Sequence, residues 1–250
     1  MVIHTYGDPG DPVVILLHPM LITGEQMYEM LGTKLKGNYF FISPDQGGHG
    51  DDKDDYVSPD KDAEELYRYL KENGYTDIAL LFTASMGGVP AMQLLSKEDL
   101  HFRSVHIDGT PLAKLDPVTA LIMQLLYQKY RKQAIKDPSK VAAALGKQYG
   151  EEAGRKMAEQ FAKLSAKSVW RIVKYCTIGS AVPLSDELCS RMTFEWGEKE
   201  IDAKGGRPLA EKMYPSSKVI IRKDWDHCEY MAKNRQQYAD ELSAEMADRA

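Results

Sequence analysis

The chain has 250 residues, long enough for one α/β domain with a sizeable core, and its composition is that of an ordinary globular protein. Its formal net charge of −5 argues against nucleic acid or an anionic membrane as a partner, because both attract basic patches. No apolar run approaches the ~20 residues that cross a bilayer, and the first residues do not resemble a secretory signal. Three widely spaced cysteines without a C-x-x-C pair fit a reducing compartment, so we expect a cytoplasmic protein without a disulfide framework or structural zinc site.

Six short, nearly continuous apolar segments are predicted to be strands. Because they do not alternate between polar and apolar residues, both faces of each strand are expected to be buried, as in a parallel sheet covered by helices. The predicted strands cover residues 13–18, 39–43, 78–83, 104–108, 192–196 and 218–223.

Helical patterns lie between these strands. The clearest has Ser58 as N-cap and Pro59 at the first helical position, and it ends at Gly74. Residues 228–250 are predicted to form a terminal amphipathic helix. This alternation of strands and helices predicts a mostly parallel, doubly wound α/β sheet.

One long insertion interrupts the alternation. Residues 112–188 contain no convincing strand and are rich in Ala, Lys, Gln, Leu and Met, with breaks at Pro117, Pro138 and Gly150. We therefore expect a helical cap of three or four helices in this insertion. The core would then comprise residues 1–111 and 189–250.

A single serine stands where a buried strand meets a helix. In "TASMGG", Ser85 follows the strand at 78–83, and two glycines open the next helix. A tight turn there would expose the hydroxyl, and unpaired N–H groups at a helix start favour the negative charge that develops on a carbonyl oxygen under attack. A serine in this position can also simply cap a helix. The stretch alone leaves both interpretations open.

The same stretch resembles the nucleophile elbow of the α/β-hydrolase superfamily, usually G-x-S-x-G, with Thr83 at the first glycine position. "LLHPM" resembles the family's His-Gly segment, with Pro19 in place of glycine. Since proline has no N–H, the resemblance implies Met20 as the oxyanion donor of this loop and Met86, directly after Ser85, as the second donor.

A further segment, "SPDQGGHGD", resembles the family's D-x-x-G-x-G turn. In that turn, the Asp45 carboxylate is expected to brace the loop, and His49 is expected to lie at the surface.

The superfamily's chain order of serine, acid and histidine implies the partners of Ser85. His227, in "RKDWDHCEYM", follows the last predicted strand, where the family carries its base. "FEWGEKEID" resembles the strand-then-G-x-x-D segment, and Glu200 falls at the acid position. Asp108, after the preceding strand, and Asp202, next to Glu200, remain alternative acids.

The resemblance covers nearly the whole chain and implies an α/β-hydrolase fold with the helical cap inserted after the family's sixth strand. It also implies a serine hydrolase that cleaves a carboxylic ester through an acyl-enzyme, with no metal and no organic cofactor. The apolar residues next to the oxyanion segments favour a small, fairly hydrophobic ester. We expect Leu21 and Ile22, beside the oxyanion segment, and Tyr127 and Trp170, from the cap, to line the substrate pocket.

Other functions stay open. The same triad can hydrolyse a carbon–carbon bond or transfer an acyl group. A non-catalytic ligand-binding protein is a third alternative, because Thr83 and Pro19 depart from the family's pattern. The expected partner is a small-molecule substrate, and the cap and the final helix are reasonable contact surfaces for a homodimer.

Overall fold

One sheet of eight strands forms the centre of the molecule, in the order β1-β3-β2-β4-β6-β7-β8, with β5 paired to β4. In this computed structural model, which describes residues 1–249, every strand pair is parallel except β1 with β3. The strands are β1 (Val2–Tyr6), β2 (Val13–Leu17), β3 (Phe40–Asp45), β4 (Asp77–Ala84), β5 (His101–Phe102), β6 (Val105–Asp108), β7 (Met192–Gly197) and β8 (Lys218–Arg222).

The six predicted strands are confirmed, with ends that differ by at most two residues. Two strands lacked the continuous apolar signal. β1 lies at the edge of the sheet and is only half-buried, and β5 has just two residues. The mostly parallel, doubly wound α/β sheet is therefore as predicted.

Alternate residues of the central strands face two separate cores. In β2, Val13, Ile15 and Leu17 pack into one hydrophobic cluster, while Val14 and Leu16 pack into another. This two-residue period follows from strand geometry, since successive side chains point to opposite faces. Helices on both faces bury these clusters, which explains why strands of the centre read as continuous apolar runs.

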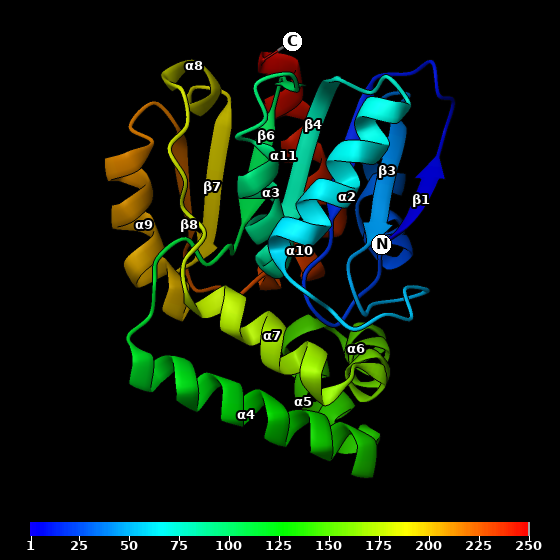
Figure 1. Cartoon of the computed structure of the whole chain (residues 1–250), viewed down its shortest axis with the longest axis vertical. Coiled ribbons are helices and arrows are strands. Elements are labelled where there is room, and N and C mark those ends of the chain that lie inside the picture. The colour runs from blue at the N-terminus through cyan, green and yellow to red at the C-terminus, as the bar shows by residue number, and fades with distance from the viewer. Residues whose placement is uncertain (250) are drawn as a thin grey trace.

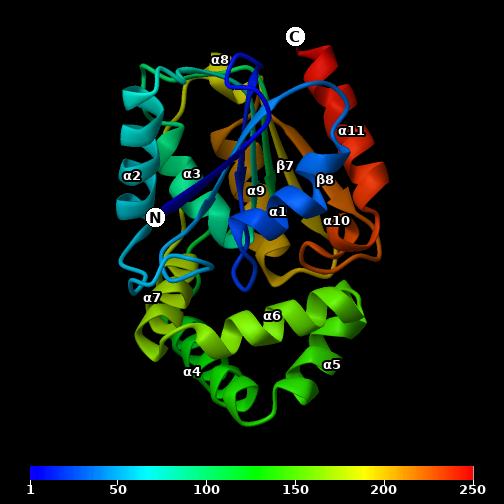
Figure 2. The same cartoon turned by 90° about the vertical axis from the view of Figure 1, so that its right-hand side faces the viewer.

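Figure 2 shows α2 and α3 on one side of the sheet and α1 and α11 on the other. The helices flanking the sheet are α1 (Gly24–Met30), α2 (Pro59–Glu72), α3 (Gly88–Leu94), α9 (Ile201–Met213) and α11 (Arg235–Asp248). Shorter elements are η1 (Gly32–Lys34), η2 (Ser85–Gly87), α8 (Asp186–Cys189) and α10 (Glu229–Lys233). No helix in residues 1–249 combines the length and apolar character that crossing a membrane requires.

Two helix predictions have different outcomes. Ser58 caps α2 as predicted, because its Oγ accepts a hydrogen bond from the N–H of Lys61 at 3.2 Å. The single terminal helix predicted for residues 228–250 is wrong. Asn234 has non-helical dihedral angles and separates α10 from α11. Ala250, the last residue of that prediction, lies outside the described residues.

Four helices between β6 and β7 form a layer beyond the carboxyl ends of the strands (Figure 1). They are α4 (Pro117–Lys136), α5 (Pro138–Tyr149), α6 (Glu151–Lys163) and α7 (Ala166–Thr177). The side chains of Asp116 and Asp137 cap α4 and α5, each followed by proline at the first helical position. The four helices share a core around Phe161 and Val169, which also contacts Leu21 of the sheet domain.

Candidate active site

Ser85 sits on a sharp turn at the carboxyl end of β4, in the middle of the sheet. Its φ of 51° lies in the left-handed region, which a residue with a side chain seldom adopts. The chain directly after Ser85 packs closely against the end of β2 and against Thr110. A Cβ on Gly87 would lie 2.5 Å from the carbonyl oxygen of Leu17, and one on Gly88 would lie 1.8 Å from Thr110 Oγ1. The two glycines after Met86 are therefore required by packing.

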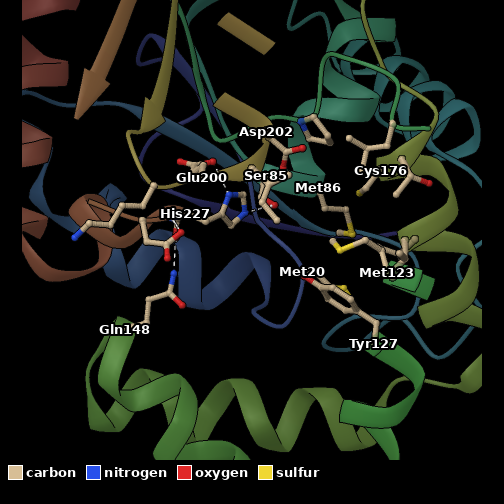
Figure 3. Close-up of a pocket in the computed structure, with 18 of the residues that line it drawn as sticks. Met20, Ser85, Met86, Met123, Tyr127, Gln148, Cys176, Glu200, Asp202 and His227 are labelled. Atoms are coloured by element: carbon tan, nitrogen blue, oxygen red, sulfur yellow. Dashed lines mark hydrogen bonds and ion pairs between the residues drawn. The ribbon is translucent and has the colours of Figure 1, made fainter. Parts of the chain in front are cut away.

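Ser85, His227 and Glu200 form a continuous line of hydrogen bonds (Figure 3). The Ser85 Oγ lies 2.7 Å from His227 Nε2, and His227 Nδ1 lies 2.7 Å from Glu200 Oε2. The other Glu200 oxygen accepts a hydrogen bond from the N–H of Gly197 at 2.6 Å, at the end of β7. Glu200 is thus held between the strand end and the imidazole, which fixes Nδ1 as the protonated nitrogen and leaves Nε2 to face the hydroxyl.

The three candidate acids differ in what they contact. Asp108 is buried at the end of β6, where its Oδ2 accepts a hydrogen bond from Tyr238 Oη at 3.1 Å. Burial, together with the nearby Glu195 and Glu200, raises the pKa of Asp108 to about 8. Asp202 has neither a hydrogen bond nor an ion pair in residues 1–249. Among the three candidates, Glu200 alone bonds to His227 in the described chain.

The electrostatic surroundings of His227 favour its protonated form. Burial opposes the charged imidazolium, but the hydrogen-bonded Glu200 carboxylate favours it, and the pKa of His227 is raised above its ordinary value. A histidine supported in this way is a good proton acceptor for a nearby hydroxyl.

A buried network holds the loop that carries Met20. The Nδ1–H of His18 donates to the carbonyl of Pro19 at 2.8 Å, and the N–H of Gln46 donates to His18 Nε2 at 3.0 Å. The side-chain amide of Gln46 donates to the carbonyl of His18 at 2.6 Å. The second predicted oxyanion donor, Met86, lies in the first turn of η2, where N–H groups have no intrahelical partner.

His49 lies under this loop and is fully buried, so the prediction of a surface position is wrong. The N–H of Leu21 points to His49 Nε2 at 3.5 Å, while Nδ1 bonds to the carbonyl of Gly47 at 3.2 Å. Burial lowers the pKa of His49 to about 3, so the ring stays neutral and keeps an acceptor nitrogen. Asp45 braces the turn as expected, since its Oδ1 accepts a hydrogen bond from the N–H of Gly24 at 2.8 Å.

If the site hydrolyses an ester, Gln46→Leu should lower kcat by about tenfold, with a smaller effect on KM. The substitution leaves the buried carbonyl of His18 unpaired and loosens the loop of Met20, a cost of about 1–3 kcal/mol. Steady-state kinetics and a melting curve measure the two effects separately. Gln236→Leu, on the exposed side of α11, is the matched control. An unchanged kcat in a less stable Gln46→Leu protein would mean that Gln46 acts on folding alone.

A cavity beside Ser85 is lined by most of the predicted pocket residues. Leu21, Ile22 and Tyr127 line it as predicted. Trp170 does not, and its side chain is 38% exposed. α7 buries the face that carries Val169 and Val173, and Trp170 lies on the opposite face.

Several cap residues at the cavity were not predicted from the sequence. Gln148 of α5 donates a hydrogen bond to the carbonyl of His227 at 3.3 Å, and Met123 and Tyr149 line the wall next to it. These residues carry no local signal, because their role depends on the cap folding back over the sheet.

Two groups of side chains in residues 1–249 lie close enough together to hold a metal ion. The groups are His4, Asp45 and Asp51, and Glu200, Asp202 and His227. Within these groups, His4 bonds to the Asp45 carboxylate at 2.9 Å, and Glu200 bonds to His227, whereas Asp202 has no such partner in residues 1–249.

Many solved structures resemble this fold over nearly the whole chain. An α/β-hydrolase family protein from Desulfitobacterium hafniense has a TM-score of 0.71 at 14% identity, with 97% of this chain and 98% of that chain covered. An esterase from Exiguobacterium antarcticum has a TM-score of 0.75 at 13% identity, with 98% and 94% covered. A bromoperoxidase from Bacillus anthracis has a TM-score of 0.75 at 17% identity, with 98% and 95% covered.

No protein-family model and no curated protein sequence matches the chain. At such low identities, the structural likeness establishes the α/β-hydrolase fold, which hosts many chemistries, and it leaves the activity to be argued from the site itself.

Proposed function

We propose that this chain, which has the α/β-hydrolase fold, is a serine hydrolase that cleaves a small, fairly hydrophobic carboxylic ester through an acyl-enzyme. One observation carries the proposal: hydrogen bonds of 2.7 Å join Glu200 to His227 and His227 to Ser85. A hydroxyl, a base and an acid in this order form the constellation that activates serine for nucleophilic attack.

In the first half of the reaction, His227 Nε2 takes the Ser85 proton as Oγ attacks the carbonyl carbon. The resulting oxyanion accepts hydrogen bonds from the N–H groups of Met20 and Met86. His227 then gives its proton to the leaving alcohol, and the acyl group stays on Ser85. Glu200 stabilises the imidazolium while it exists.

In the second half, a water molecule loses a proton to His227 Nε2 and attacks the acyl carbonyl. Collapse of this second tetrahedral intermediate releases the carboxylic acid and returns the proton to Ser85. The apolar side chains at the cavity, such as Leu21, Ile22 and Met123, support an uncharged and fairly hydrophobic acyl group.

The proposal is tested by incubating the protein with short-chain p-nitrophenyl esters and with a fluorophosphonate probe. We expect steady release of p-nitrophenol and a stoichiometric label on the peptide that contains Ser85. Added alcohol distinguishes hydrolysis from acyl transfer, since a transferase would divert the acyl group to the alcohol. Labelling without ester turnover would point to another triad chemistry, such as carbon–carbon bond hydrolysis. Neither labelling nor turnover would favour a ligand-binding protein.

A further inference from the structure

The cavity beside Ser85 divides into two lobes that meet at Ser85 and His227, each with a volume of about 370 Å³. We call the first the apolar lobe. It extends under the cap, and its wall includes Leu21, Ile22, Leu126, Leu145, Met157 and Phe161. We call the second the acidic lobe. It extends toward α9, and its wall includes Lys199, Glu200, Asp202 and Asp226.

Three of the charged groups in the acidic lobe already have partners. Glu200 bonds to His227, and Asp226 Oδ1 accepts a hydrogen bond from the N–H of His227 at 2.7 Å. The Lys199 ammonium donates to the carbonyl of Asp224 at 2.5 Å.

Asp202 is different, because it lines the cavity without a hydrogen bond or an ion pair in residues 1–249. It is half-buried, and one of its carboxylate oxygens lies within 4.8 Å of a His227 ring nitrogen. Figure 3 shows it close to Ser85 and Glu200. A carboxylate in this position is an acceptor to which the described part of the chain offers no donor, and a bound molecule can supply one.

The charge of the lobe favours a cation over an anion. Among the described residues, three carboxylates, from Glu200, Asp202 and Asp226, line this lobe. They face the ammonium group of Lys199 and the imidazole of His227, so carboxylates still outnumber the basic groups. Partial burial strengthens their attraction for a positive group, since the effective dielectric constant there is lower than in water. Asp202 lies in the first turn of α9, where the helix dipole favours a carboxylate, while burial and the nearby Glu200 raise the pKa of Asp202.

The proposed proton transfers bear on which lobe holds the alcohol of the ester and which lobe holds the acyl chain. His227 Nε2 must protonate the leaving alcohol, so the alcohol lies against the imidazole. His227 lines both lobes, and Asp202 of the acidic lobe lies within 4.8 Å of one of its ring nitrogens, so we assign the alcohol to the acidic lobe. The acyl chain then extends into the apolar lobe.

We propose that the substrate is an amphiphilic ester of an amino alcohol, with its protonated amine on Asp202 and its apolar acyl chain beneath the cap. This inference rests on the proposed ester hydrolysis and adds the chemical class of both halves of the ester. Asp202 is then a specificity-determining residue that contacts the substrate and takes no part in the proton transfers.

Two hexanoate esters of the same shape test the acidic lobe. One carries a 2-(dimethylamino)ethyl alcohol, which is protonated at neutral pH, and the other carries a neutral 3-methylbutyl alcohol. We expect kcat/KM to be about tenfold higher for the amine, the size of one charge-assisted hydrogen bond after desolvation. In Asp202→Asn, the ratio of the two kcat/KM values should fall to within about twofold of one.

Asp60→Asn, an exposed substitution on α2 with the same change in net charge, should keep the preference of the wild type. Equal kcat/KM values for the two esters in the wild type would overturn the proposal. A preference that survives Asp202→Asn would also overturn it, because the amine would then be recognised elsewhere.

The apolar lobe is tested with 2-(dimethylamino)ethyl esters of acetate, hexanoate and decanoate. Ala153 of α6 lines the lobe, and Ala153→Phe should fill it and shift the preference from hexanoate to acetate. Ala153→Ser keeps the size and should keep the order of the wild type. Leu126→Phe, on another part of the same wall, serves if Ala153→Phe does not fold. An unchanged chain-length order in both phenylalanine variants would place the acyl chain outside this lobe.

A wrong substrate class and a wrong enzymatic function give different experimental results. If Ser85 is labelled and both hexanoates are cleaved at equal rates, the ester hydrolase stands and the amino alcohol is wrong. If the wild type cleaves neither ester and Ser85 is not labelled, the proposed function is wrong, and this inference falls with it.

Discussion

Replacing Ser85 with alanine is expected to lower kcat/KM for p-nitrophenyl esters by about 10⁴-fold or more. The substitution removes the oxygen that forms the acyl-enzyme, and only the oxyanion donors and substrate binding remain to accelerate the reaction. His227→Gln should have an effect of similar size. The double variant should be no worse than either single one, because the two residues act as one unit.

Steady-state hydrolysis and fluorophosphonate labelling measure this result together. Ser96→Ala removes the hydroxyl of an exposed serine after α3, and it should keep both the activity and the label. If Ser85→Ala kept more than a small fraction of the wild-type rate, a different group would be the nucleophile.

Glu200→Gln is expected to lower kcat by about 10³-fold while the fold stays intact. Glutamine can still accept a hydrogen bond from His227, but it provides no negative charge for the imidazolium. The variant should also change the pH profile. The pKa of His227 is raised with help from the Glu200 carboxylate, and His227 must be neutral to accept the serine proton. The acidic limb of kcat/KM should therefore move to lower pH in Glu200→Gln.

Asp108→Asn is the matched control, since the resemblance to the family allowed Asp108 as an alternative acid. We expect its activity to stay within a few-fold of the wild type. If the two variants exchanged these outcomes, with Asp108→Asn inactive and Glu200→Gln active, Asp108 would be the acid.

Asp108→Asn is also expected to change how the stability of the protein depends on pH. The pKa of Asp108 is raised to about 8 from an ordinary value of 3.8. The stability that its buried proton provides is present below about pH 4 and is lost as the pH rises toward 8. Asparagine does not titrate, so Asp108→Asn should gain stability relative to the wild type over this interval. Denaturant unfolding at several pH values measures the difference.

Features with local physical causes could be predicted from the sequence. The strands appear as apolar runs because a central parallel strand is buried on both faces. α2 begins at Pro59 because Ser58 caps the helix and proline is favoured at the first helical position. The turn at Ser85 is also local, because small residues are needed where β4 passes directly into α3. These features established the order of the elements and hence the α/β fold.

Contacts between distant segments could not be predicted in the same way. His49 looked like a surface residue in its own turn, and it is buried because the loop that carries Met20 and Leu21 folds over it. Trp170 and Phe161 look alike as cap aromatics, but only the packing of the helices places one at the surface and the other in the core.

The sequence by itself determined which helices and strands form, their order, and which few residues are candidates for each catalytic role. Helix and strand propensity and the spacing of apolar residues depend on only a few neighbouring residues. Only the tertiary structure decided that Glu200 bonds to His227 and that Asp108 bonds to Tyr238. It also decided that Asp202 lines the cavity with no partner among residues 1–249. Asp108 lies at the end of β6, and Glu200 and Asp202 lie beyond the end of the neighbouring β7. Their different contacts depend on the conformation of loops packed against segments far away in the chain, which no short stretch of sequence records.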